Sequence, residues 1–190
     1  ALYAHQRRDR DAIDALILNA PFLSFAGSPI ERIALRSVFS RVGRLDPRWI
    51  VQKDGGPMYG WSLHRDFGKG GAWEFDLLWK RAGALPVYAG WVRAIHSGHE
   101  EVRRGLAIAC PVFVVTSARS GGGKDWNASW LETDAVLDVV DVRRLAWGLG
   151  ANVTQRALPG ALHDVILSAP QVREAAYAAM LAWVGSVLPG

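Results

Sequence analysis

The stretch Leu158-Pro159-Gly160-Ala161-Leu162-His163-Asp164 decides how this chain of 190 residues is interpreted. The run from Val153 to Leu158 precedes it and predicts a strand, which the Pro-Gly pair brings to an end. Pro170 then begins the last helix of the chain. His163 therefore lies on a loop that leaves a strand, a position from which an imidazole can act as a general base.

Strands and helices alternate along the rest of the chain. Ile13 to Leu18 predicts a strand buried on both faces, and the β-branched run from Pro111 to Thr116 predicts the clearest strand. Helices are expected to begin at Ser28-Pro29, at Leu85-Pro86, at Asp141 as N-cap of 142–149, and at Pro170, where Val172, Ala176, Ala179, Trp183 and Val187 form an apolar stripe. Strands separated by helices predict an α/β fold with a parallel sheet and right-handed crossovers.

A long irregular segment interrupts this alternation. Between Gly43 and Gly83 the pattern is broken by glycines and prolines, and the segment contains Trp49, Tyr59, Trp61, Phe67, Trp73, Phe75 and Trp79. Its aromatic content argues against disorder, and long irregular loops are usually functional. We expect residues 25–95 to form a cap or lid inserted into one α/β domain, covering an apolar pocket.

Composition excludes several classes of function. The net charge of +4 comes from scattered arginines, without the basic and aromatic runs of a nucleic-acid-binding protein. The single Cys110 is expected to be a small buried residue, and it allows no disulfide within the chain, which favours a reducing, cytoplasmic location. Apolar runs are too short for stable membrane insertion. Neither paired cysteines nor H-E-x-x-H spacing is present, so we expect no metal and no cofactor.

An acidic residue after one parallel strand and a histidine after the next would meet at the same edge of the sheet. The carboxylate would fix the imidazole tautomer, leaving the second ring nitrogen to take a proton from a nucleophile. Asp134 and Asp138 both follow the 111–116 strand and are candidates for this orienting role toward His163. Asp164 is expected to accept from loop amides. Surface positions or local hydrogen bonds are expected for His5, His64, His96 and His99.

These segments together resemble the C-terminal part of an α/β-hydrolase. They look closest to the monoacylglycerol lipase and lysophospholipase-like branch, which is often grouped with serine aminopeptidase-like hydrolases. The segment from Asp14 to Phe22 looks like the strand after the nucleophile helix, with an Asn-x-Pro exit. Residues 111–116 look like the strand before the acid loop, 134–138 like the acid segment, and 160–164 like the G-x-x-H-D/E segment; Trp183 matches a tryptophan of the last helix.

The resemblance covers essentially the whole chain and implies roles for individual residues. Asp134 would be the acid and His163 the base of a Ser-Asp-His triad. Residues Pro21, Phe22, Trp61 and Trp91 are expected to contact the substrate. The enzyme would be a serine hydrolase that cleaves carboxylic esters with an apolar acyl group, lipid-like or acylglycerol-like.

The chain departs from the family in one important respect, because it contains no G-x-S-x-G motif. The glycine-rich stretch from Ser120 to Gly123 follows the wrong strand and lacks this pattern. We therefore expect the nucleophilic serine and the oxyanion hole to lie upstream of Ala1, in an N-terminal part of the same domain. This chain alone is expected to be inactive and to expose the edge of its 13–18 strand, which is an aggregation hazard.

Two other functions remain open at this point. A non-catalytic protein of the same fold would bind a ligand or partner without the chemistry. A peptidase or amidase, or a dehalogenase with an aspartate nucleophile, would keep the fold and change the reaction. A peptidase that binds an amine should have a carboxylate cluster in the cap, and Glu74 and Asp76 are too few to indicate one.

Overall fold

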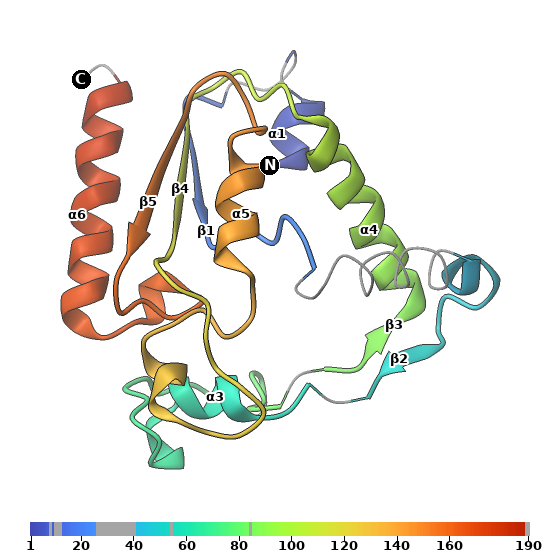
Figure 1. Ribbon diagram of the computed structural model, residues 1–190, viewed down its shortest axis with the longest axis vertical. Coiled ribbons are helices and arrows are strands. Elements are labelled where there is room, and N and C mark those ends of the chain that lie inside the picture. Colours follow the sequence, from blue (N-terminus) through green and yellow to red (C-terminus); the bar gives the residue numbers. More distant parts are fainter. Residues whose placement is uncertain (8, 10–12, 26–40, 54, 84, 189–190) are drawn as a thin grey trace. The chain divides into compact units, whose positions relative to one another are not determined.

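The computed structural model describes residues 1–7, 9, 13–25, 41–53, 55–83 and 85–188 (Figure 1). The chain divides into two compact units. The first consists of Ala1–Ser24 with Glu101–Gly190, and the second of Phe25–Glu100. The helix expected at Ser28-Pro29 lies outside the described residues.

A sheet of three parallel strands forms the centre of the first unit. Its strands are β1 (Leu16–Asn19), β4 (Val112–Ser117) and β5 (Val153–Leu158), in the order β1-β4-β5. Both pairings are parallel. The α/β fold with a parallel sheet is therefore confirmed, and β5 has the predicted bounds.

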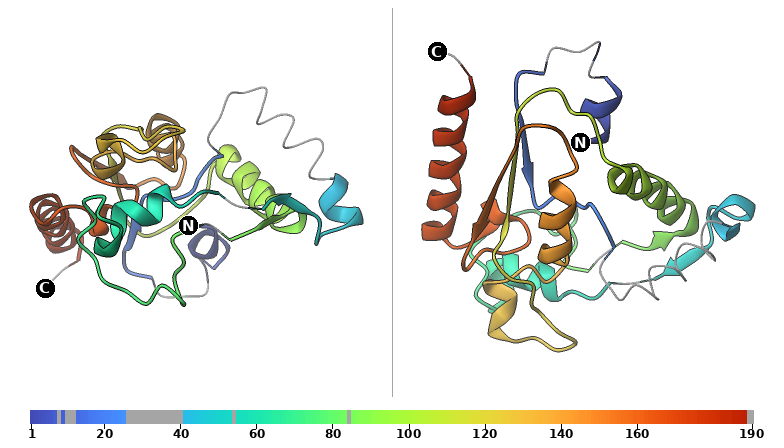
Figure 2. Two further views of the ribbon diagram at one scale, coloured as in Figure 1. Left: turned by 90° about the horizontal axis from the view of Figure 1, so that it is seen from below. Right: turned by 45° about the horizontal axis from the view of Figure 1, so that its top comes forward.

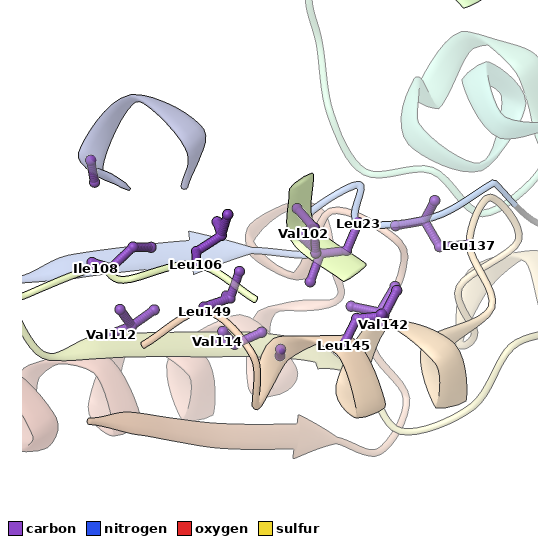
Figure 3. Close-up of a cluster of buried hydrophobic side chains, with 12 residues drawn as sticks. Leu23, Val102, Leu106, Ile108, Val112, Val114, Leu137, Val142, Leu145 and Leu149 are labelled. Carbon is purple, nitrogen blue, oxygen red and sulfur yellow. The ribbon is translucent and has the colours of Figure 1, made fainter. Parts of the chain in front are cut away.

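The central strand β4 is buried on both faces because different helices cover them (Figure 2). Val112 and Val114 belong to a cluster that includes residues of helix α5 (Val139–Ala146), as Figure 3 shows. Phe113 and Val115 alternate with them and pack in a second cluster, against helix α6 (Pro170–Val187). The period of two in the strand thus divides its side chains between two helices.

Strand β1 differs from its prediction. Its residues alternate between half-buried and exposed, and Ile17 is 39% exposed, so the expectation of burial on both faces is wrong. Leu16 and Leu18 pack against the α5 cluster. Among the described strands β1 pairs only with β4, and this edge position explains why one of its faces has less cover.

The helices of the first unit also bury residues that the sequence singled out. Trp183 of α6 packs against Phe113 and donates from its indole nitrogen to the Thr154 hydroxyl over 3.2 Å. Cys110 was expected to be buried but is only half-buried, where it packs against the α5 cluster; burial raises the pKa of its thiol. A further short helix, α1, covers Leu2–Gln6.

Helix α5 begins three residues earlier than predicted. Asp138, not Asp141, is its N-cap, and the Asp138 carboxylate accepts from the amides of Val140 and Asp141. Asp141 lies in the first turn and pairs with Arg144 instead. The prediction was wrong because two aspartates one helical turn apart both suit the start of a helix.

The second unit contains a short antiparallel pair, β2 (Ile50–Gln52) with β3 (Val87–Tyr88). Its helices include α3 (Met58–Leu63) and most of α4 (Ala89–Arg104). Helix α4 begins at Ala89, so the helix start predicted at Leu85-Pro86 is wrong. Its last four residues, 101–104, belong to the first unit.

The histidines outside the His163 loop have hydrogen-bond, ion-pair or ring partners, and the partner of His5 is distant in sequence. His64 is buried, where its Nε2 lies 3.0 Å from the Phe75 carbonyl oxygen and its Nδ1 accepts from the Asp66 amide. His5 Nδ1 accepts from the amide of Ala107. His99 is buried in edge-to-face contact with a phenylalanine ring, and His96 lies beside Glu100. Burial of His64 and His99 excludes a surface position for these two.

No helix of the described residues has both the length and the apolar character that crossing a membrane requires.

Candidate active site

The three strands of the first unit end at one edge of the sheet. Because β1, β4 and β5 are parallel, their last residues Asn19, Ser117 and Leu158 lie on the same side. Loops that leave this edge are where α/β folds bind ligands. Two of them are important here: the acid loop, residues 118–138, and the His loop, residues 159–169.

Asp134 of the acid loop is held more firmly than a surface carboxylate. Its side chain is 1% exposed, and its Oδ1 accepts from the amides of Val136 and Leu137, each over 2.8 Å. Its own amide donates to the Arg119 carbonyl, and its carbonyl accepts from Gly121. These four hydrogen bonds fix both the backbone and the carboxylate plane, so Oδ2 points in one direction.

Ser120 closes the acid loop. Its hydroxyl donates to the Leu137 carbonyl over 2.8 Å and accepts from the Val139 amide over 2.9 Å, which joins the two ends of the loop. Ser120 also forms an isolated parallel bridge with Asp134. The sequence suggested no role for this serine, because its partners lie 17 and 19 residues away.

The glycines beside Ser120 allow the two branches of the acid loop to approach closely. A Cβ atom added to Gly121 would lie 2.1 Å from the Thr133 hydroxyl oxygen. Gly122 has a φ of +86°, and a Cβ there would lie 2.8 Å from that of Ala135. Both glycines are therefore required by the packing next to Asp134.

The His loop is anchored on both sides of His163. It begins at the predicted Pro159-Gly160 turn, where Gly160 has a φ of +73°. Leu162 is buried, and its amide donates to the hydroxyl of Ser168 over 2.9 Å. The His163 side chain remains 23% exposed, so its ring is held by the loop and still reaches solvent.

Asp134 and His163 meet at this edge. Asp134 Oδ2 lies 3.0 Å from Nδ1 of His163, although 29 residues separate them. Because Oδ1 is occupied by two amides, the hydrogen-bond network assigns a proton to Nδ1 and leaves Nε2 as the basic nitrogen. Asp138, the other candidate for this role, caps α5 instead. The arrangement can hold an imidazole in the tautomer that accepts a proton through Nε2.

Asn19 also contacts the His loop, which the sequence did not indicate. Its side-chain oxygen accepts from the Val165 amide over 3.1 Å, and its Nδ2 donates to Oδ1 of Asp164 over 2.5 Å. Asp164 accepts as well from the Ile166 amide, as expected of a loop carboxylate. Asn19 lies 145 residues from Asp164, so no local pattern could reveal the contact.

The residue after Asn19 has an unusual backbone conformation. Ala20 has a φ of +43°, the only positive value among described residues other than glycine. An L-residue pays roughly 1–2 kcal/mol for this conformation. Ala20 is nevertheless buried, and its amide still donates to the Val115 carbonyl over 2.8 Å, which extends the β1–β4 ladder by one residue. The chain therefore leaves the sheet in an abrupt, strained turn.

The four residues expected to contact substrate fall in different units. Pro21 and Phe22 follow Ala20 in the first unit, where Phe22 is partly exposed. Trp61 and Trp91 belong to the second unit. The Lys69 ammonium lies over the Trp61 ring, 5.9 Å from its centre, and Trp91 is 47% exposed.

No group of three or more His, Cys, Asp or Glu side chains suited to a metal ion occurs among the residues that the structure describes.

Comparison with known proteins gives matches at the level of structure. No protein-family model matches the chain, and no curated protein does. The structure is similar to the crystal structure of Paleococcus ferrophilus monoacylglycerol lipase, with a TM-score of 0.66, 17% identity, and coverage of 98% of this chain and 63% of that one. It is also similar to a soluble variant of monoglyceride lipase from Saccharomyces cerevisiae in complex with a substrate analog, with a TM-score of 0.63, 13% identity, and coverage of 98% and 60%. The chain thus spans less than two thirds of either lipase. At these identities the likeness establishes a shared fold.

Proposed function

We propose that this chain, which has the α/β-hydrolase fold, is part of a serine hydrolase that cleaves carboxylic esters. His163 is the general base in this proposal, and Asp134 orients it. The nucleophilic serine lies upstream of Ala1 in the intact protein, because the 190 residues contain no G-x-S-x-G motif.

The hydrogen bond between Asp134 and His163 carries the proposal. Asp134 is buried, and one of its oxygens accepts from two backbone amides while the other contacts the imidazole. This is the geometry of the orienting acid in a catalytic triad. The His163 side chain is 23% exposed and lies at the carboxyl ends of the strands, which is where α/β-hydrolases present their nucleophile.

The first half of the reaction forms an acyl-enzyme. His163 Nε2 takes the proton from the serine hydroxyl while the serine oxygen forms a bond to the ester carbonyl carbon. Asp134 stabilises the imidazolium and remains ionised. The bond between the carbonyl carbon and the alcohol oxygen then breaks, and the imidazolium gives its proton to the leaving alcohol.

The second half regenerates the enzyme. Water takes the place of the alcohol, and His163 removes one of its protons as the water oxygen bonds to the acyl carbon. When the bond to the serine oxygen breaks, the imidazolium returns that proton to the serine. The products are a carboxylic acid and an alcohol, and no cofactor is consumed.

The substrate in this proposal has an apolar acyl group, lipid-like or acylglycerol-like. Residues 25–95 would form the cap that receives it, with Trp61 and Trp91 together with Pro21 and Phe22 as contacts. A peptidase is less well supported, because it would need a cluster of cap carboxylates to bind the substrate amine. Glu74 instead forms an ion pair with Arg65, and Asp76 accepts from the Leu78 amide. The single half-buried Cys110 suits a cytoplasmic enzyme.

The proposal is tested by labelling the full-length protein with a fluorophosphonate probe and mapping the modified residue. We expect one labelled serine, upstream of Ala1 in a G-x-S-x-G motif, and hydrolysis of a medium-chain p-nitrophenyl ester. His163→Ala should abolish both, whereas His5→Ala should leave both intact, because His5 hydrogen-bonds the Ala107 amide and not the site. An absence of labelled serine would refute the serine hydrolase and favour a non-catalytic binding protein.

A further inference from the structure

We infer that Asn19 is a positioning residue for His163, because it fixes the two residues that follow His163 while Asp134 fixes the ring. Asn19 ends β1, and its side chain bonds to Asp164 and Val165, the two residues that follow His163. The inference rests on the proposed function, because it assigns a role within that same site.

The chemistry of the contact requires an amide at position 19. One end of the side chain accepts from a backbone N–H, and the other donates to a carboxylate oxygen. Only a side chain with one acceptor and one donor at this separation satisfies both. Aspartate would place like charges against each other, and leucine would leave the Val165 amide without its acceptor.

The hydrogen bonds of Asn19 hold the backbone of the His loop just after His163. Asp164 Oδ1 is shared between the Asn19 amide and the Ile166 N–H, so one carboxylate joins β1 to the turn of 165–167. Val165 is fully buried, which makes this turn a firm support. His163 therefore lies between two fixed points: its ring on Asp134, and its following residues on Asn19.

The backbone next to Asn19 supports the same conclusion. Ala20 adopts a left-handed conformation that alanine disfavours, yet it retains the ladder bond to Val115. With regular strand geometry at Ala20, β1 would continue beyond Asn19. The turn instead ends the strand at Asn19, where the side chain reaches the His loop, and the rest of the unit maintains the strained conformation.

An exchange of charges separates positioning from general stabilisation. In the double variant Asn19→Asp with Asp164→Asn, the carboxylate at 19 accepts from the Val165 amide and from the new side-chain amide, which removes the charge repulsion present in N19D. The bond from the Ile166 amide is lost, because one Asp164 oxygen accepts from both Asn19 and Ile166. N19D alone breaks the pair because it opposes two carboxylates. D164N alone keeps an amide oxygen that can accept from both Asn19 and Ile166, so it should have little effect. Thr154→Val is the matched control, because it removes one side-chain hydrogen bond, to Trp183, near the start of β5.

The experiment measures kcat and KM for a p-nitrophenyl ester with the full-length protein, together with the ¹H and ¹⁵N NMR signals of the His163 ring. We expect Asn19→Ala and N19D to lower kcat about 10- to 100-fold with KM unchanged, since small displacements of a catalytic group cost this much. The double exchange should recover part of the loss seen in N19D, because it restores the hydrogen bond between residues 19 and 164 but not the one from Ile166. Thr154→Val should change neither constant.

The measurements decide between a positioning role for Asn19 and a purely structural one. If Asn19→Ala and Thr154→Val have equal effects, or if the exchange recovers nothing, Asn19 has no positioning role. If the wild-type protein is itself inactive, the hydrolase proposal fails and the NMR signals decide alone. In that case, a shifted Nδ1 proton signal in Asn19→Ala, absent from Thr154→Val, supports positioning, and an unchanged signal overturns it.

Discussion

Substitution of Asp134 separates its chemical role from its structural one. Asp134→Asn preserves the shape of the side chain, and the amide oxygen can still accept from Val136 and Leu137. Its NH₂ group then faces His163 Nδ1, which must become an acceptor, so the ring proton moves to Nε2. An imidazole in this tautomer cannot take a proton from serine through Nε2. Asp134→Ala removes all three hydrogen bonds instead.

Asp134→Asn should lower mainly kcat, whereas Asp134→Ala should lower the free energy of unfolding as well. In a Ser-His-Asp triad, the change from aspartate to asparagine lowers kcat about 10⁴-fold through the wrong tautomer. The alanine variant additionally leaves the buried Leu137 amide without an acceptor, which costs about 1–3 kcal/mol. The Val136 amide belongs to a residue that is 42% exposed, so water can replace its acceptor at little cost. Asp134→Ala should thus be less stable than Asp134→Asn by about 1–3 kcal/mol.

Urea unfolding and initial-rate kinetics on the full-length protein measure both quantities, and ¹⁵N NMR of the His163 ring reports the tautomer. Asp125→Asn is the matched control, since this exposed aspartate lies in the same acid loop, and its free energy of unfolding should change by less than about 0.5 kcal/mol. The reasoning is refuted if Asp134→Asn keeps kcat within about tenfold of the wild-type value. Equal stability of the Asn and Ala variants would refute the structural part.

Three further changes test the packing around the site by urea unfolding. Ser120→Ala should lose about 1–3 kcal/mol and lower kcat, because both ends of the acid loop bond to this hydroxyl, whereas the exposed helical Ser97→Ala should change little. Gly121→Ala should lower the free energy of unfolding by about 1–3 kcal/mol, because its Cβ would clash with Thr133. Gly185→Ala in α6, whose Cβ would meet nothing within 4 Å, should raise it by up to about 1 kcal/mol. Equal effects of the two variants would contradict the structure. Trp183→Ala should cost about 3–5 kcal/mol, against little for exposed Leu181→Ala on the same helix.

Local patterns in the sequence predicted the elements of the first unit well. The β-branched run at 111–116 and the proline at 170 are strong local signals, and β4 and α6 follow them. The strand at 87–88 was missed because its pairing with β2, 35 or more residues earlier in the chain, decides its conformation. The exposed edge of β1 was expected, but the burial of its faces was misjudged, because an apolar run does not show which of its faces other elements cover.

Within the candidate site, too, the sequence predicted the contact that follows from the sheet topology and missed the contacts between residues far apart in the chain. The meeting of Asp134 and His163 followed from the topology of a parallel sheet, which brings the loops after β4 and β5 to one edge. Choosing between Asp134 and Asp138 required the resemblance, because residue type and position suit both. The residues that support the pair, Ser120 and Asn19, bond to partners far along the chain, and a common serine or asparagine gives no local signal of this.

The double duty of Asp134 has an evolutionary consequence. Selection for folding alone will resist the loss of this carboxylate to alanine, because the loop amides of Val136 and Leu137 depend on it. A gene copy released from selection for activity would therefore retain an acceptor at this position, and asparagine is an acceptor of the same shape that a single nucleotide change can supply. Among relatives of this protein, asparagine at position 134 should mark lineages that have given up the chemistry and kept the fold.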